Sequence, residues 1–183
     1  MGNFPNLGER ITWSCNHSNS GVLVVDGNSF GFQIAREINW LHGPQYHSFQ
    51  YYVEQHYSYL IRTGKRIIVV FDGALPKYKV SERLSRNQER VDKIHELLKE
   101  ATAAVVDPGS QSLAASILPP FAVPIVIETV KKLGVEYIIA KEEADSVIAG
   151  LAKKYNGYVL SQDSDFYVYD IPGFIPLDSI NFK

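Results

Sequence analysis

The chain alternates short, continuously apolar runs with longer stretches in which apolar residues recur at helical spacing. The apolar runs have the length of β-strands and lie at residues 21–25, 66–71 and 135–140 and from residue 158 onward. A run without polar alternation indicates a strand covered on both faces, as in a parallel sheet. Because helical patterns fill the intervals, we predict a parallel α/β sheet with right-handed crossovers.

The helical patterns predict four helices of ordinary length. They are expected over 28–41, with Asn28 or Ser29 as the N-cap, and over 46–62, 121–133 and 141–156. The second is crowded with aromatic residues, and their helical spacing favours a core helix over a base-stacking platform. The tail, residues 171–183, is predicted to form an edge strand and a turn.

A fifth, highly charged helix is predicted from residue 76 to about residue 101. Its first half has few apolar residues and is expected to stand away from the core, whereas Val91, Ile94, Leu97 and Leu98 give the second half a packing face. One face carries a basic stripe at i, i+4, i+7 and i+11, formed by Lys79, Arg83, Arg86 and Arg90. Two readings stay open: a solvated helix whose Glu82 and Glu89 pair with the arginines, or a phosphate-binding face.

Two segments lack a clear periodic pattern. Residues 1–20 are polar and rich in Asn, Gly and Ser, so we expect an irregular N-terminal arm. Residues 101–120 are small and apolar and contain turn-forming Pro and Gly, with Asp107 as the only charge. This segment is read either as a mobile cap or as a surface that docks a protein partner.

The amino-acid composition excludes several kinds of site and protein. The net charge is −2, so any affinity for nucleic acid must come from a local basic patch. Cys15 is the only cysteine, which excludes an internal disulfide and a cysteine-based zinc site, and the five histidines show no ligand spacing. No apolar run is long enough for a membrane span, and we expect the nucleus or the cytoplasm.

Acidic residues follow each of the four predicted strands. Asp26 and Asp72 each precede a glycine at a strand end, Asp163 and Asp165 follow the fourth strand, and Glu143 and Asp145 follow the third. The carboxyl ends of parallel strands meet at one edge of a sheet, where ligands bind. Positions two apart on a helix do not face each other, so the Glu143 and Asp145 pair converges only at an irregular helix start.

Several carboxylates in one cleft repel each other unless cations bind there. Carboxylate oxygens suit a hard divalent ion, so the set predicts Mg²⁺ or Mn²⁺. Two such ions about 4 Å apart activate a water and stabilise a leaving oxygen in phosphodiester cleavage. Taken alone, the Asp163 and Asp165 pair is a weak signal, because such pairs often end a strand or cap a helix.

Four motifs in order carry a family resemblance. VVDGNS at 24–29, VVFDG at 69–73, EEAD at 142–145 and SQDSDF at 161–166 resemble the acidic motifs of the XPG / flap endonuclease superfamily of PIN-like nucleases. The sequence VLSQDSDFYVYD, followed by GFIPLDSI, is most similar to the Asteroid branch of this superfamily. The resemblance implies a three-layer PIN-like domain over 21–183, with a central mainly parallel sheet flanked by helices. It also implies a helical-arch-like insertion over about 76–120.

The resemblance also implies roles for individual residues. Two divalent ions would be held by Asp26, Asp72, Glu143, Asp145, Asp163 and Asp165. Lys79 and Arg86 match the basic pair that contacts the scissile phosphate at the base of the arch, which makes them candidate catalytic residues. Together with Arg83 and Arg90 they would bind nucleic acid.

Two function hypotheses follow. The first is a Mg²⁺- or Mn²⁺-dependent nuclease that cleaves DNA or RNA by a two-metal mechanism and is specific for a structure or for single strands. The alternative is a catalytically weak or inactive PIN-like domain that serves as a nucleic-acid-binding or protein-interaction scaffold in RNA or chromatin regulation. A phosphatase of the haloacid dehalogenase type is excluded, because Asp26-Gly27-Asn28 lacks that family's second aspartate.

Overall fold

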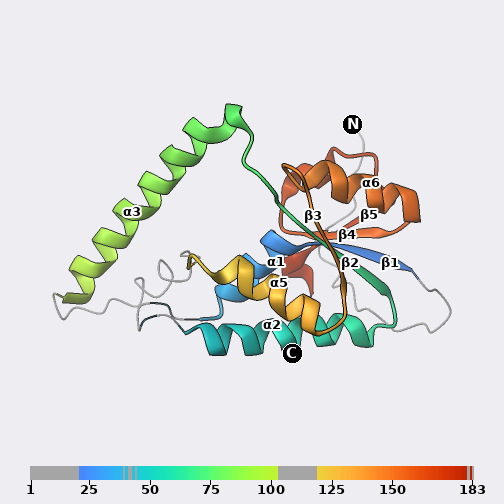
Figure 1. Ribbon diagram of the computed structural model, residues 1–183, viewed down its shortest axis with the longest axis horizontal. Coiled ribbons are helices and arrows are strands. Elements are labelled where there is room, and N and C mark those ends of the chain that lie inside the picture. The colour runs from blue at the N-terminus through green and yellow to red at the C-terminus, as the bar shows by residue number, and fades with distance from the viewer. Residues whose placement is uncertain are drawn as a thin grey trace, which may run out of the picture.

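A computed structural model describes residues 21–38, 40, 43, 45–102, 119–180 and 182. In this part of the chain, five strands form one sheet in the order β3-β2-β1-β4-β5, and every neighbouring pair is parallel (Figure 1). The strands are β1 (Val22–Asp26), β2 (Arg66–Phe71), β3 (Glu136–Ile139), β4 (Tyr158–Ser161) and β5 (Gly173–Pro176). The predicted parallel sheet is therefore confirmed.

Alternate side chains of the central strand β1 point into two separate cores. Leu23 and Val25 pack under α1 (Gly27–Ala35), α2 (Tyr46–Arg62) and α5 (Ala122–Lys132). Val24 packs on the opposite face, against Ile148 and Ala152 of α6 (Asp145–Tyr155). Figure 1 shows the resulting layers, with α6 on one side of the sheet and the other three helices on the opposite side. The predicted three-layer arrangement, with a central parallel sheet flanked by helices, is confirmed.

Helix α2 has the predicted bounds, and it is a core helix as its spacing indicated. Phe49, Val53, Tyr57 and Leu60 are all buried in the core beneath the sheet. The first helix, α1, is shorter than predicted and ends at Ala35. Its predicted N-cap was wrong. The cap is Asp26, whose carboxylate accepts a hydrogen bond from the Ser29 amide, so both predicted caps lie inside the first turn.

The charged helix stands away from the rest of the molecule (Figure 1). It begins with a 3₁₀ turn, η2 (Lys77–Lys79), and continues as α3 (Val80–Thr102). As predicted, its first half lies outside the core. The predicted packing of the second half was wrong for Val91, which is 44% exposed, while the side chains at 97 and 98 lie outside the described residues. Up to residue 96, α3 buries almost nothing.

Two local predictions near the strand ends need correction. The helix predicted from Lys141 begins only at Asp145, and residues 141–144 are irregular. After β4 the chain turns into a 3₁₀ helix, η3 (Ser164–Tyr167), instead of continuing as β structure. The physical reason in both cases is capping and hydrogen bonding at the acidic motifs, described below.

The tail forms the edge strand β5 followed by the 3₁₀ turn η4 (Leu177–Ser179), as predicted. The N-terminal arm, 1–20, and most of the 101–120 segment lie outside the described residues, so the arm, the extent of the insertion and the docking surface stay predictions. None of the helices in the described ranges is both long and apolar enough to cross a membrane.

Candidate functional site

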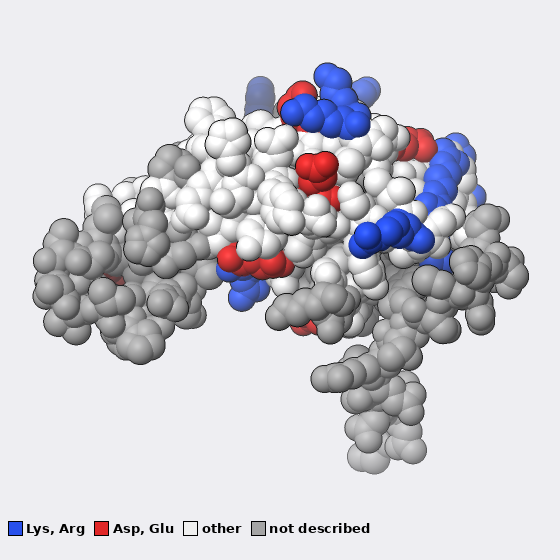
Figure 2. Space-filling model, turned by 90° about the horizontal axis from the view of Figure 1, so that it is seen from below, with Lys and Arg blue, Asp and Glu red and all other residues white. Residues whose placement is uncertain are grey.

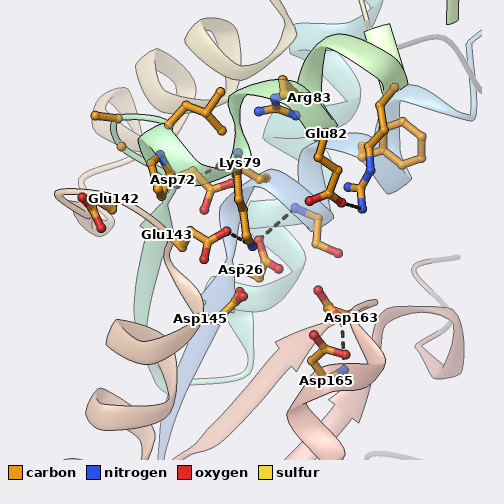
Figure 3. Close-up of a pocket in the computed structure, with 18 of the residues that line it drawn as sticks. Asp26, Asp72, Lys79, Glu82, Arg83, Glu142, Glu143, Asp145, Asp163 and Asp165 are labelled. Atoms are coloured by element: carbon orange, nitrogen blue, oxygen red, sulfur yellow. Dashed lines mark hydrogen bonds and ion pairs between the residues drawn. The ribbon is translucent and has the colours of Figure 1, made fainter. Parts of the chain in front are cut away.

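A cleft of about 680 Å³ lies at the carboxyl ends of the strands and gathers the predicted acids. All six line it, namely Asp26, Asp72, Glu143, Asp145, Asp163 and Asp165. The predicted basic stripe lines the same cleft, with Lys79, Arg83, Arg86 and Arg90. Figure 3 shows Lys79 and Arg83 above Asp26, Glu143 and Asp145, with Asp163 and Asp165 on the other side of the opening. The structure thus brings together every residue that the sequence singled out.

Asp26 is fixed at the floor of the cleft. The Ser161 hydroxyl donates to its Oδ2 at 2.7 Å, and the Ser29 amide donates to its Oδ1 at 2.9 Å. Only 8% of Asp26 is exposed, and this burial raises the pKa of its carboxyl group, with smaller contributions from the charges of Asp72 and Asp163. The carboxylate is therefore held in one orientation by two hydrogen bonds.

Asp72 is oriented by residues from two other motifs. Asn28 donates from Nδ2 to Asp72 Oδ2 at 2.9 Å, and the Asp72 amide donates back to Asn28 Oδ1 at 3.2 Å. The Ala144 amide donates to Asp72 Oδ1 at 2.9 Å. Both oxygens of this carboxylate are thus positioned, and the first three acidic motifs are joined to each other through it.

The irregular segment 141–144 is held against the end of β2. The Gly73 amide donates to the Glu142 carbonyl at 2.7 Å, and the Ala74 amide donates to the Lys141 carbonyl at 2.9 Å. The backbones approach so closely that a Cβ on Gly73 would lie 1.8 Å from the Ala140 carbonyl oxygen. Because residues 141–144 are not helical, Glu143 and Asp145 both reach the cleft. An irregular helix start was the condition under which the sequence predicted that this pair converges.

Asp163 and Asp165 lie in the turn from β4 into η3. Asp163 caps this turn, since its Oδ1 accepts a hydrogen bond from the Asp165 amide at 2.9 Å. The Asp163 amide in turn donates to the Ser161 hydroxyl at 3.0 Å. The capping interpretation of this aspartate pair is therefore correct, and it holds together with the pair's place in the cleft.

Burial, together with the charges of neighbouring acids, changes the protonation of one carboxyl group in the cleft. The pKa of Asp145 is raised to about 6, first by burial and then by the charges of Asp26, Asp163, Asp72 and Glu143. Burial and the same acidic neighbourhood raise the pKa of Tyr169, which lies just beyond η3. The cleft thus concentrates negative charge that the protein itself only partly compensates.

Lys79 provides part of that compensation. Its ammonium group forms an ion pair and hydrogen bond with the Glu143 carboxylate, and this bond raises the pKa of Lys79. On α3, Arg86 pairs with Glu82 at 2.5 Å, so the solvated-helix interpretation is correct for this pair. The phosphate-binding interpretation stays a prediction, and the place of the basic stripe in the lining of the cleft is compatible with it.

Charge is less concentrated on the face seen in Figure 2, on the α2 side of the molecule. There, acidic and basic side chains form small, separate groups with broad uncharged surface between them.

Sequence reasoning missed several residues that shape the cleft. Asn28, Ser29 and Ser161 position the acids, and Glu82 and Glu142 add two further carboxylates to the lining. Asn28 was interpreted only as a helix cap. Its position in the VVDGNS motif was the signal that could have identified it as a residue of the site.

The donor set suits a hard cation, because carboxylate oxygens dominate the floor of the cleft. Among the residues that the structure describes, no three acidic, histidine or cysteine side chains converge closely enough to make a ready-formed ion site. Ion binding would therefore draw the carboxylates inward and offset the negative charges that, after burial, raise the pKa of Asp145.

Comparisons with known proteins agree with this architecture. A family model described as XPG domain containing matches residues 118–183. The catalytic core of Rad2 in complex with DNA substrate is similar in fold, with a TM-score of 0.54 at 20% identity over 84% of this chain and 42% of that chain. Human GEN1 in complex with Holliday junction DNA has a TM-score of 0.51 at 16% identity, over 86% and 35% of the two chains. The match over residues 118–183 and the similar fold agree with the predicted resemblance to the XPG / flap endonuclease superfamily, whose PIN-like fold this chain shares.

The sequence is similar to proteins of the Asteroid branch, as the motifs indicated. Asteroid homolog 1 of Schizosaccharomyces pombe is 31% identical over 170 residues, which cover 87% of this chain and 28% of the relative. A Danio rerio protein named single-strand DNA endonuclease ASTE1 is 28% identical over 88% of this chain and 22% of its own length. The chain thus spans about a quarter of the length of these relatives.

Proposed function

We propose that this domain is a divalent-metal-dependent nuclease that cleaves phosphodiester bonds of DNA. The observation that carries the proposal is the placement of six acids and four basic residues on one cleft. Relatives named single-strand DNA endonucleases and the DNA-bound structures of similar fold favour DNA over RNA, and unpaired DNA in particular. The two-metal mechanism belongs to this proposal.

Mg²⁺ or Mn²⁺ would be held by the six acids, and a pair of such ions supplies an activated water and stabilisation of the leaving oxygen. The chain's own residues prepare the site for this. Ser161 and Ser29 fix Asp26, and Asn28 fixes Asp72, so these carboxylates lose little freedom on binding.

Lys79 and Arg86 would orient the scissile phosphate from the side of η2 and α3. Both line the cleft, and each is paired with a glutamate that it can exchange for a phosphate oxygen. Arg83 and Arg90 extend the basic face along α3 and would follow the backbone of the strand. These contacts position the substrate without reading its sequence.

The proposal is tested by incubating the protein with end-labelled single-stranded, flap and hairpin DNA, and with RNA of the same sequences, in Mg²⁺, Mn²⁺ or EDTA. We expect metal-dependent cleavage of the unpaired DNA that Asp72→Asn and Asp163→Asn each abolish. Glu128→Gln on the outer side of α5 is the matched control and should cleave normally. Cleavage that survives both aspartate substitutions would overturn the assignment.

A second candidate function is a nucleic-acid-binding module that keeps the acids without cutting. One observation favours it: Glu143 is already paired with Lys79, and the carboxylates in the described part of the chain are spread around the cleft. Calorimetry with Mn²⁺ separates the two, because this function predicts DNA binding without ion binding. The 101–120 partner surface and a nuclear or cytoplasmic location stay predictions.

A further inference from the structure

Directly after the last acidic motif, the chain exposes three consecutive apolar side chains. Tyr167, Val168 and Tyr169 are 65%, 85% and 37% exposed, and we call them the aromatic rim. Single exposed apolar residues are ordinary on a protein surface. Three in a row beside a candidate site are more specific, because contiguous apolar surface commonly marks a contact with a ligand or partner.

The two rings of the aromatic rim are held from beneath by buried or half-buried rings. Tyr167 lies edge-on to Phe174 of β5 at a centroid distance of 4.8 Å, and Tyr169 lies 5.6 Å from Phe166. Phe166 itself is only 1% exposed and stacks with Phe174 at 6.0 Å. The outer side of this aromatic cluster is thus open and already ordered, which lowers the entropy cost when a planar ligand stacks there.

The aromatic rim lies beside the acids of the cleft. Tyr167 is the last residue of η3, the turn that begins after Asp163 and contains Asp165. Tyr169 lies two residues beyond η3, and its ring packs on Phe166, the residue that follows Asp165. The following acid, Asp170, is paired with Lys153 at 2.5 Å, so this charge is compensated close to the rim.

We infer that the aromatic rim stacks against unpaired bases of the nucleic-acid strand whose phosphate lies in the acidic cleft; this inference rests on the proposed function. A base presents a flat π-face that stacks on tyrosine regardless of sequence. In a duplex these faces are covered by neighbouring bases, so the rim favours single strands, flaps and frayed ends. The place of the rim directly after Asp163 and Asp165, which line the cleft, selects this occupant.

The test uses the full chain with Ca²⁺ in place of Mg²⁺, so that binding is measured without relying on cleavage. The probe is a short single-stranded DNA with one 2-aminopurine, together with a version that is abasic at that position. We expect the wild-type protein to quench the 2-aminopurine, and the Tyr167→Ala/Tyr169→Ala variant to bind about tenfold more weakly and without quenching. Tyr167→Phe/Tyr169→Phe should restore both properties, and Tyr51→Ala, which removes an exposed ring on α2, should change neither.

The abasic probe separates stacking from a general structural effect. If the rim stacks on that base, the wild-type protein and the double alanine variant bind the abasic DNA about equally. Equal binding of the normal probe by both proteins, an equal loss on both probes, or no binding by the wild-type protein would each overturn the inference. A changed oligomeric state in the variant would do the same, since it would identify the rim as a protein interface.

The outcomes also distinguish this inference from the nuclease proposal. If quenching depends on the rim but no cleavage occurs in Mg²⁺ or Mn²⁺, the stacking inference is supported and the nuclease proposal is wrong. If the wild-type protein and the double alanine variant both cleave DNA, with no quenching and equal affinities, the nuclease proposal is supported and the stacking inference is wrong.

Discussion

The ammonium group of Lys79 is paired with the carboxylate of Glu143, which joins the turn before α3 to the segment before α6. One candidate phosphate-binding residue therefore neutralises one candidate metal ligand. An ion that binds at Glu143 competes with Lys79, and Lys79 becomes available to a phosphate when it leaves. This pairing makes several properties of the cleft measurable.

Lys79→Gln removes the cation that competes for Glu143. We expect Mn²⁺ to bind about two- to fivefold more tightly, because an exposed ion pair contributes modestly, while the affinity for DNA falls. Isothermal titration calorimetry measures the first quantity and fluorescence anisotropy the second. Lys77→Gln in the same turn is the control, since Lys77 does not line the cleft. Weaker Mn²⁺ binding by Lys79→Gln would contradict the competition.

Asn28→Ala removes the side chain that orients Asp72. Groups that orient a ligand typically change metal affinity by 10- to 100-fold, so we expect Mn²⁺ binding to weaken by about tenfold. The free energy of unfolding in EDTA should fall by less than about 1 kcal/mol, because the hydrogen bonds involved are exposed. Gln88→Ala removes a comparable exposed bond to Asp92 on α3 and should leave Mn²⁺ affinity unchanged.

Asp145 makes the stability of the metal-free domain depend on pH. Its pKa is about 6 in the folded protein and 3.8 when unperturbed, so between these values the folded state binds more protons than the unfolded state. The free energy of unfolding therefore falls as pH rises through this window, and the decrease is complete above about pH 6. Metal-free Asp145→Asn should then be more stable than the wild-type protein at pH 7.5 by about 1 kcal/mol, after allowance for the partial exposure of the group.

Thermal unfolding in EDTA checks this prediction. The expected gain in Tm for Asp145→Asn is about 3 °C at pH 7.5 and close to zero below about pH 3, where the carboxyl group is mostly protonated in both states. With Mn²⁺ present, the wild-type protein should gain more than the variant. An equal gain at both pH values would show that charge is not the cause.

Gly73 is required by the close approach between the end of β2 and residue 140. A Cβ at this position would meet the Ala140 carbonyl oxygen at 1.8 Å, so Gly73→Ala must push the two segments apart. We expect destabilisation by about 2 kcal/mol in urea unfolding, together with weaker Mn²⁺ binding. Gly150→Ala, in the middle of α6 with no atom within 4 Å, should instead stabilise by about 0.5 to 1 kcal/mol.

The arginines of α3 should act through charge alone. Substitution of Arg83 or Arg90 by Gln is expected to weaken DNA binding and to reduce the slope of log affinity against log salt by about 1 for each phosphate that the variant no longer neutralises. Lys132→Gln at the end of α5 is the control and should leave the slope unchanged. Anisotropy titrations at several salt concentrations measure these slopes. A weaker affinity with an unchanged slope would show that the arginine does not bind a phosphate.

The sequence was sufficient wherever local patterns determine structure. β2 and α2 have the predicted bounds, because their apolar patterns are long and the Thr63-Gly64-Lys65 turn separates them. The convergence of the acids also followed from chain order, since parallel strands bring their carboxyl ends to one edge.

Predictions failed where distant residues override local preference. Lys141-Glu142-Glu143-Ala144 favours a helix by propensity, yet hydrogen bonds from Gly73 and Ala74 hold its backbone in an irregular form. Asn28 was assigned a local capping role because its actual partner, Asp72, lies 44 positions away along the chain. Pairing at that range leaves no periodic signal in a single sequence.

Helix α3 has a consequence for how this domain evolves. Its described side chains up to residue 96 contribute little to the core, so replacing them changes the free energy of unfolding very little. Selection can therefore alter the charge, length and spacing of this helix to suit new substrates without endangering the sheet. Several of the acids, by contrast, are fixed by hydrogen bonds between distant motifs, so we expect related domains to diversify along α3 while the acids stay the same.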